Sequence, residues 1–136
     1  PLWLTVRPLT VIERTSRRTD FERLATLARQ EEATAVVCGL PLNLDGSEGA
    51  QAQSVRKWAM RLAQALRVLL GRPLPVIFWD ERLSTFAAQE LIDGGSQDAE
   101  DALAAALILE GYLAAQKRGE TVSFGRIELE NKNESP

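Results

Sequence analysis

The sequence contains no histidine and a single cysteine, Cys38. The lack of histidine excludes nucleophilic mechanisms of the Ser-His and Cys-His type, and one cysteine cannot form an internal disulfide. A zinc site would have only Cys38 and carboxylates to draw on. If the chain is an enzyme, carboxylates are therefore the expected catalytic side chains.

Long apolar runs and an excess of positive charge are also missing. No run approaches the roughly 20 apolar residues needed to span a bilayer, and the first residues lack the order of a signal peptide. We therefore expect a cytoplasmic protein with no membrane partner. The net charge of −3 argues against a non-specific nucleic-acid coat, which needs clustered Lys and Arg. A nuclease is not excluded, because metal-binding carboxylates themselves add negative charge.

The chain has 136 residues, which is long enough for one domain with a single core. Strands are predicted where β-branched and apolar residues run together, over 9–13, 34–40 and 74–79. Helices are predicted where apolar residues recur at helical spacing, over 20–31, 47–70, 84–93 and 98–117. This order of elements indicates an α/β sheet with parallel neighbours.

Local signals predict where these helices begin and end. We expect Asp20 to cap the first helix, Ser47 the second, and Ser84 or Thr85 the third. Gly71 should end the second helix. The residues expected on the buried stripe of that helix are Val55, Trp58, Ala59, Leu62, Leu66 and Leu69.

The strands at 34–40 and 74–79 are continuous apolar runs, which are typical of strands buried on both faces. Beyond residue 118 the chain turns polar, so we divide it into a domain at 1–118 and a tail at 119–136. Val122, Phe124, Ile127 and Leu129 suggest a short arm within that tail. The final segment, ENKNESP, is predicted to be disordered.

Acidic residues follow the strand at 74–79 and open the last predicted helix. Glu81 should emerge at the rim of the sheet, while Asp98 and Asp101 share one helical face. If this helix lies flat on the sheet, its first-turn acids approach Glu81. Converging carboxylates suit Mg²⁺ or Mn²⁺, which take hard oxygen ligands. The alternative is structural, because a strand can end in Glu81 and the helix dipole alone favours acids in a first turn.

A turn-rich loop, PLNLDGS, separates the strand at 34–40 from the long helix. Asn43 and the backbone amides near Gly46 and Ser47 form a candidate phosphate site at the helix N-terminus. The Gly-Lys-Ser/Thr element of a Walker loop is absent, and on these residues alone a capped turn without ligand is the favoured interpretation. The basic residues of the helix are likewise interpreted as a solvated face: Arg56, Lys57, Arg61 and Arg67.

Three sequence blocks occur in the order found in one protein family. The block GLPLNLDGSEGAQAQSVRKWAMRL resembles the YqgF/RuvX signature of a strand, a GLP turn, an Asn-x-Asp-Gly loop and a helix. WDERLSTFAAQELI resembles the Asp-Glu-Arg-Leu-Ser/Thr-Thr block of this family, and DALAAALILEGYL resembles its closing helix. The resemblance covers residues 7–115, nearly the whole predicted domain.

The resemblance implies an RNase H-like fold, a mixed sheet flanked by helices, and a divalent-metal nuclease. Members are assigned to maturation of the 5′ end of pre-16S rRNA, and early members were described as Holliday junction resolvases. By motif, Glu81 is implied to be the second metal-binding acid and Asp101 the third, with Mg²⁺ or Mn²⁺ as cofactor. Asp98 has no clear counterpart. Asn43, Arg82 and Ser84 are the candidates for contacts to the phosphate backbone.

The chain departs from the family pattern at two places. Members begin with a strand that supplies the first catalytic aspartate, whereas here no acid precedes Glu13. We therefore expect about twenty further N-terminal residues in the natural protein, and an exposed edge at 34–40 without them. The connection before the last helix also lacks the basic loop of the family.

Two alternatives stay open at this point. If the chain truly starts at Pro1, a catalytically incomplete nucleic-acid-binding module is favoured over a nuclease. The residues also do not separate structured RNA from branched DNA as the partner, because that choice depends on shape and on 2′-hydroxyl contacts.

Overall fold

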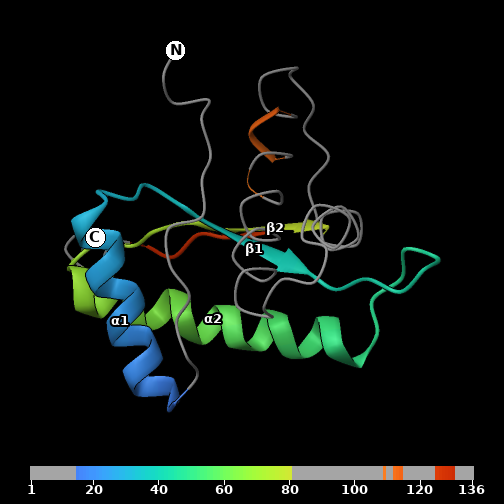
Figure 1. The fold of residues 1–136 in the computed structure, drawn as a ribbon, viewed down its shortest axis with the longest axis horizontal. Helices are drawn as coiled ribbons and strands as arrows, with labels where there is room; N and C mark the ends of the chain where they lie inside the picture. The colour runs from blue at the N-terminus through green and yellow to red at the C-terminus, as the bar shows by residue number, and fades with distance from the viewer. Residues whose placement is uncertain (1–14, 81–108, 110–111, 115–124, 131–136) are drawn as a thin grey trace, which may run out of the picture.

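The computed structural model describes residues 15–80, 109, 112–114 and 125–130. Within these ranges the elements follow the order α1 (Arg17–Gln30), β1 (Val36–Leu40), α2 (Ala50–Leu70), β2 (Val76–Asp80) and β3 (Arg126–Ile127), as Figure 1 shows. The strand predicted at 9–13 and the helix predicted at 84–93 lie outside the described residues. Of the last predicted helix, residues 109 and 112–114 are described, and they are helical.

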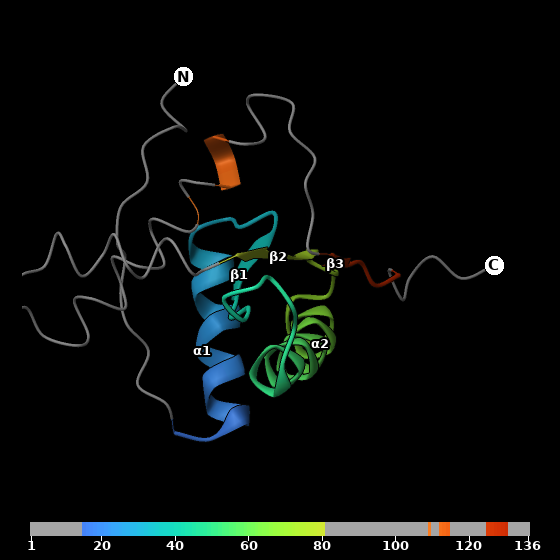
Figure 2. The ribbon, with the colours of Figure 1, turned by 90° about the vertical axis from the view of Figure 1, so that its right-hand side faces the viewer.

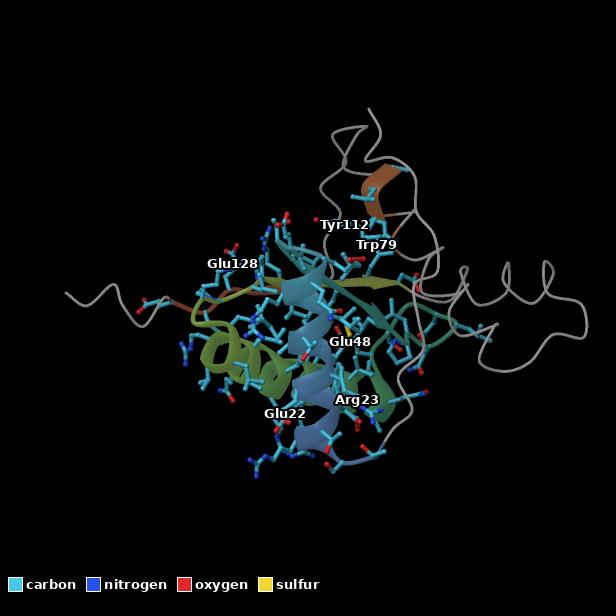
Figure 3. All side chains as sticks on the ribbon, turned by 60° about the vertical axis from the view of Figure 1, so that its left-hand side comes forward. Glu22, Arg23, Glu48, Trp79, Tyr112 and Glu128 are labelled. Carbon is cyan, nitrogen blue, oxygen red and sulfur yellow. The ribbon has the colours of Figure 1, made fainter. Side chains whose placement is uncertain are left out.

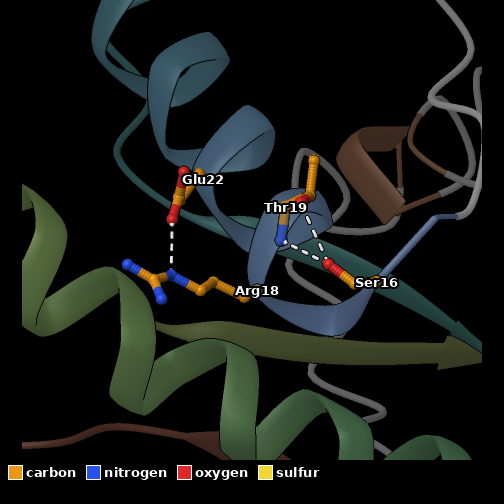
Figure 4. A network of polar contacts seen from close by, with 4 residues as sticks. All are labelled: Ser16, Arg18, Thr19 and Glu22. Atoms are coloured by element: carbon orange, nitrogen blue, oxygen red, sulfur yellow. Dashed lines mark hydrogen bonds and ion pairs between the residues drawn. The ribbon is translucent and has the colours of Figure 1, made fainter.

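Helix α1 begins earlier than predicted and has a different N-cap. The Ser16 hydroxyl oxygen accepts the backbone N–H of Thr19 at 3.2 Å, and the same hydroxyl donates to Thr19 Oγ1 at 2.9 Å (Figure 4). Asp20, the predicted cap, is buried in the first turn, where its Oδ1 accepts the N–H of Thr15 at 3.2 Å. The prediction was wrong because Asp20 turns back onto the residue before the cap, which leaves Ser16 to satisfy the helix amides.

Helix α2 begins after Gly49, which makes no side-chain cap hydrogen bond, so the prediction of Ser47 as its cap was also wrong. Its end is as predicted, because Gly71 adopts the left-handed conformation at φ 77° that closes a helix. The buried stripe contains Ala59, Leu62 and Leu66, whereas Leu69 is 40% exposed. No helix in the described part of the chain combines the length and apolarity needed to span a bilayer.

The three strands form one mixed sheet in the order β1-β2-β3. β1 and β2 are parallel, with Leu40 opposite Asp80 at their carboxyl ends. β3 runs antiparallel to β2 and places Ile127 opposite Val76. Of the short arm suggested by the sequence, Arg126 and Ile127 are thus paired with the sheet, whereas Val122 and Phe124 lie outside the described residues.

Both long helices cover the same face of this sheet, where they lie side by side (Figure 2). One cluster of buried residues fills the space between α2 and the strands, namely Leu40, Leu42, Ala52, Ala59, Ala63, Val76 and Phe78. A second cluster joins α1 to α2 and consists of Phe21, Ala25, Ala28, Leu62, Leu66 and Leu74. Val36 and Trp58 pack against both clusters and make the core continuous.

Burial on both faces, as predicted, is confirmed for β2 over Val76–Phe78 and is wrong for most of β1. In β1 only Leu40 is buried, because β1 is the terminal strand of the described sheet order. On β2, Trp79 points away from the two helices and meets Tyr112 edge-on, with ring centroids 5.5 Å apart (Figure 3). Tyr112 therefore lies on the second face of the sheet, so the described residues place helical residues on both sides of it.

Candidate active site

The carboxyl ends of β1 and β2 define one edge of the sheet. Because the strands are parallel and Leu40 lies opposite Asp80, the chain leaves both strands at the same edge. In open α/β sheets, binding sites form beyond these ends. From β1 the chain enters residues 41–49, called here the β1–α2 loop, which extends beyond the end of β1 in Figure 1. After β2, the next residue in the chain is Glu81.

The β1–α2 loop is folded around a tight turn. The N–H of Gly46 donates to the carbonyl oxygen of Asn43 at 2.8 Å, which closes a four-residue turn with Leu44 and Asp45 at its tip. Gly46 has a φ of 88°, a backbone angle that residues other than glycine rarely adopt. The loop is anchored in the core by Leu42, which is 9% exposed.

Hydrogen bonds that involve polar side chains of the loop stabilise this turn. The Asp45 Oδ1 atom accepts both the backbone N–H of Ser47 at 2.9 Å and its hydroxyl at 2.6 Å. The Asn43 Nδ2 group donates to Ser47 Oγ at 3.0 Å, and the Asn43 N–H donates to the Ser47 carbonyl at 2.9 Å. Ser47 therefore serves the loop rather than the helix, because its hydroxyl is held by Asp45 and Asn43.

Asn43 was predicted to contact phosphate, and the structure shows what its side chain does within the loop. Besides its bond to Ser47, its amide lies close to Gly49, where an added Cβ would stand 3.2 Å from Asn43 Oδ1. Gly49 thus provides the space that Asn43 occupies. The contact of Asn43 with phosphate stays a prediction.

Arg56 ties the loop to the helix and the sheet. Its guanidinium donates two hydrogen bonds to the Glu48 carboxylate, at 2.6 and 2.7 Å, and lies 4.7 Å from the centre of the Phe78 ring. The hydrogen bond from Arg56 lowers the pKa of Glu48 and correspondingly raises the pKa of Arg56. For Arg56, the interpretation as a solvated face was therefore wrong, because Glu48 and Phe78 are brought to it by the fold.

The pairing of Glu48 with Arg56 was not predicted from the sequence. Glu48 precedes the helix and Arg56 lies two turns inside it, a separation outside the i, i+4 pattern that predicts pairs within a helix. One feature of the sequence could have indicated the pair: Glu48 lies just before α2, a helix that contains no acidic residue of its own. Lys57 and Arg61, by contrast, are exposed, as predicted.

A cleft of about 440 Å³ lies between β1 and the first half of α2. Its walls are formed by six residues, Cys38, Gly39, Gln51, Ser54, Val55 and Trp58. From the sequence, Cys38 was considered only as the single thiol that cannot form an internal disulfide and that a zinc site could use. The lone thiol is half-buried in the wall of this cleft.

The remaining residues predicted for the site lie outside the described part of the chain. These residues are Glu81, Arg82, Ser84, Asp98 and Asp101. The ranges that the structure does describe contain no group of three histidine, cysteine, aspartate or glutamate side chains suited to a metal ion. The structure therefore places the loop and the strand ends, and the roles of these five residues stay predictions.

Comparison with known proteins decides the family. The family model described as "RuvX: Holliday junction resolvase" matches residues 1–115. The chain belongs to the RuvX family. The mixed sheet with helices on both sides accordingly represents the RNase H-like fold expected from the sequence blocks.

Curated relatives agree with this placement. A protein of Myxococcus xanthus named "Putative pre-16S rRNA nuclease" is 44% identical over 126 residues, which cover 88% of this chain and 80% of the relative. A protein of Anaeromyxobacter with the same name is 44% identical, with 80% of each chain covered. A third, from Thermoanaerobacter pseudethanolicus, is 36% identical over 116 residues, 80% of this chain and 79% of the relative.

Proposed function

We propose that this RuvX protein is a divalent-metal-dependent nuclease that hydrolyses phosphodiester bonds in structured RNA, in the 5′ processing of pre-16S rRNA. The observation that carries the proposal is the identity of 44% with a relative named for that activity, over 80% of the relative's length. The common edge at Leu40 and Asp80 supports it, because this is where parallel sheets hold their sites.

Carboxylates are the proposed ligands of the metal. Glu81 follows β2 directly, and Asp101 stands in the block that resembles the closing helix of the family. Asp80, at the end of β2, shows that the described chain delivers a carboxylate residue to this edge. Oxygen ligands of this kind suit Mg²⁺ or Mn²⁺. A bound divalent ion would supply polarisation of the phosphate and activation of water.

Substrate binding is assigned to the β1–α2 loop and to the residues after β2. Asn43, Arg82 and Ser84 are proposed to contact the phosphate backbone. The described geometry supports a role for the loop, because its turn is held by internal hydrogen bonds and stands next to the strand ends. A loop fixed in this way loses little conformational freedom when a ligand binds.

Cleavage of a labelled hairpin from the 5′ region of pre-16S rRNA tests the proposal. We expect cleavage by the full natural protein in Mg²⁺ or Mn²⁺ and none in EDTA. Glu81→Gln and Asp101→Asn should abolish it while leaving the thermal unfolding midpoint nearly unchanged, because an amide keeps the shape but removes the charge that holds a metal. Glu22→Gln, on the exposed surface of α1, is the matched control and should cleave normally.

Two other outcomes would redirect the assignment. The family description as a Holliday junction resolvase favours branched DNA as the second candidate substrate, and cleavage of a four-way DNA junction in place of RNA would establish it. Metal-independent binding of RNA without cleavage of either substrate would favour the non-catalytic module. Full activity of Glu81→Gln or Asp101→Asn would refute the proposed ligands.

A further inference from the structure

Leu44 is a large apolar side chain that the fold leaves in solvent. It is 98% exposed at the tip of the β1–α2 loop, whereas Leu40 and Leu42, which precede it at alternate positions, are 0% and 9% exposed. The chain therefore turns two leucines into the core and presents the third outward. Isolated exposed leucines are common on protein surfaces, so the setting of Leu44 decides whether it has a role.

The turn itself does not require leucine. Leu44 occupies the second position of a four-residue turn that begins at Asn43 and closes at Gly46. Asparagine at the first position and glycine at the last favour this turn, while its second position accepts most residues. The side chain adds nothing to the core, since it is almost fully exposed. The second position of the turn and the core therefore do not require a leucine side chain.

The position of the tip is fixed. Asp45 and Asn43 hold Ser47 through hydrogen bonds of 2.6–3.0 Å on the inner side of the turn, and the Glu48–Arg56 pair ties the end of the loop to α2. Leu44 is thus held beyond the ends of β1 and β2, at the edge assigned to the active site. A substrate that reaches this edge would meet an apolar tip that is held by hydrogen bonds within its own loop.

The chemistry around Leu44 selects the part of a nucleic acid that it fits. The adjacent Asp45 carboxylate repels a phosphate, and Leu44 offers no hydrogen bond from its side chain. The face of a base is apolar, and it is accessible in unpaired nucleotides, whereas in a duplex the bases cover one another. In DNA complexes, apolar side chains such as leucine pack against base faces that have been unstacked from their neighbours, and an unpaired nucleotide offers such a face without that cost.

We infer that Leu44 is a substrate-positioning residue that packs against an unpaired nucleobase beside the scissile phosphate. The inference rests on the proposed function and adds a preference to it: the protein selects structured RNA that carries an unpaired nucleotide next to the paired stem. Leu44 takes no part in the chemical step. It holds the strand so that the phosphate lies at the ends of β1 and β2.

Equilibrium binding to two labelled RNAs tests the inference. One is a hairpin with an unpaired 5′ extension, and the other is a blunt, fully paired duplex. Fluorescence anisotropy in Ca²⁺ measures binding of the full natural protein and of its Leu44→Ala variant. We expect Leu44→Ala to weaken binding to the extended hairpin by about tenfold, the change that follows from losing most of the burial of one leucine. Binding to the blunt duplex should not change.

The controls separate an apolar contact from general damage. Leu44→Met keeps an apolar side chain of similar reach and should restore binding. Val68→Ala removes another exposed apolar side chain, 63% exposed on α2, roughly 27 Å along the helix from its start, and should bind both RNAs normally. The salt dependence of binding should be the same for Leu44→Ala and wild type, because no phosphate contact is lost.

Each outcome bears on the inference in a stated way. A selective loss for the extended hairpin, restored by methionine, would support it. Equal binding by Leu44→Ala and Val68→Ala, or an equal loss for both RNAs, would overturn it while leaving the proposed function in place. Wild-type protein that binds neither RNA would overturn the proposed function and the inference together.

Discussion

Two glycines with left-handed backbone angles provide a matched test of the β1–α2 loop. Gly46 closes the turn of that loop at φ 88°, and Gly71 ends α2 at φ 77°. A Cβ atom added at either position would meet no atom within 4 Å. Substitution by alanine therefore changes only the backbone energy at both sites, and any difference between the variants reports on location.

The expected cost follows from these angles. A residue with a Cβ pays about 1–2 kcal/mol in the left-handed region relative to glycine. Gly46→Ala and Gly71→Ala should therefore lower the free energy of unfolding by similar amounts. With a urea dependence of about 2 kcal/mol per molar for a small domain, each midpoint should fall by about 0.5–1 M.

The two variants should differ in binding RNA. Gly46 donates the hydrogen bond that closes the turn, so a shift of its backbone moves Leu44 and Asn43. We expect Gly46→Ala to weaken binding to the extended RNA hairpin, measured by anisotropy under conditions in which both variants are fully folded. Gly71→Ala, at the opposite end of α2, should bind as the wild type does.

Two results would refute this reasoning. If Gly46→Ala cost no stability while Gly71→Ala did, the turn would not hold Gly46 in the left-handed region in solution. If both variants bound RNA equally well, the loop geometry would be irrelevant to substrate recognition. Loss of binding by Gly71→Ala would indicate that the damage spreads through α2, and the comparison would then refute a local role for the loop.

Three further predictions concern the scaffold around the site. Arg56 lowers the pKa of Glu48 in the folded state. The pair therefore stabilises the fold fully at pH values above the unfolded pKa of about 4.3. This contribution is lost as the pH falls through the lowered pKa of the folded state. Glu48→Gln should accordingly lower the urea midpoint at pH 7, and this effect should shrink as the pH falls below the unfolded pKa. An effect of the same size at every pH would contradict the role of the ion pair. Leu62 is only 1% exposed and lies between α1 and α2, so Leu62→Ala should lower the free energy of unfolding by about 2–5 kcal/mol. Met60 is 39% exposed, so Met60→Ala should change it by less than about 0.5 kcal/mol. Similar urea midpoints for the two variants would argue against the packing described. Ile127→Ala should cost about 2 kcal/mol, the low end of the range for such truncations, because Ile127 is a partly buried side chain that packs against the core and pairs with Val76. Unchanged stability relative to Glu128→Ala would show that β3 is not part of the cooperative fold.

Local sequence patterns were enough to predict the elements that surround the site. The spacing of apolar residues predicts α2 because Ala59, Leu62 and Leu66 must share one face of a helix, and Gly71 predicts its end because few other residues adopt a left-handed angle. The apolar run at Val76–Phe78 likewise predicts a buried strand. These patterns depend only on residues that are near one another in the sequence, so they can be interpreted without the tertiary structure.

The contacts that shape the site depend on residues far apart in the sequence or on competition between similar groups. Ser16 and Asp20 are both good caps, and only the path of Thr15 shows which one serves α1. Arg56 meets Phe78 because α2 and β2 share one core cluster, and it meets Glu48 because the β1–α2 loop brings that residue to the side of α2. Leu44 could be recognised as outward only once Leu40 and Leu42 were seen in the core. The sequence shows which side chains are apolar and therefore favour burial. The tertiary structure determines which of these apolar side chains are nevertheless exposed to solvent.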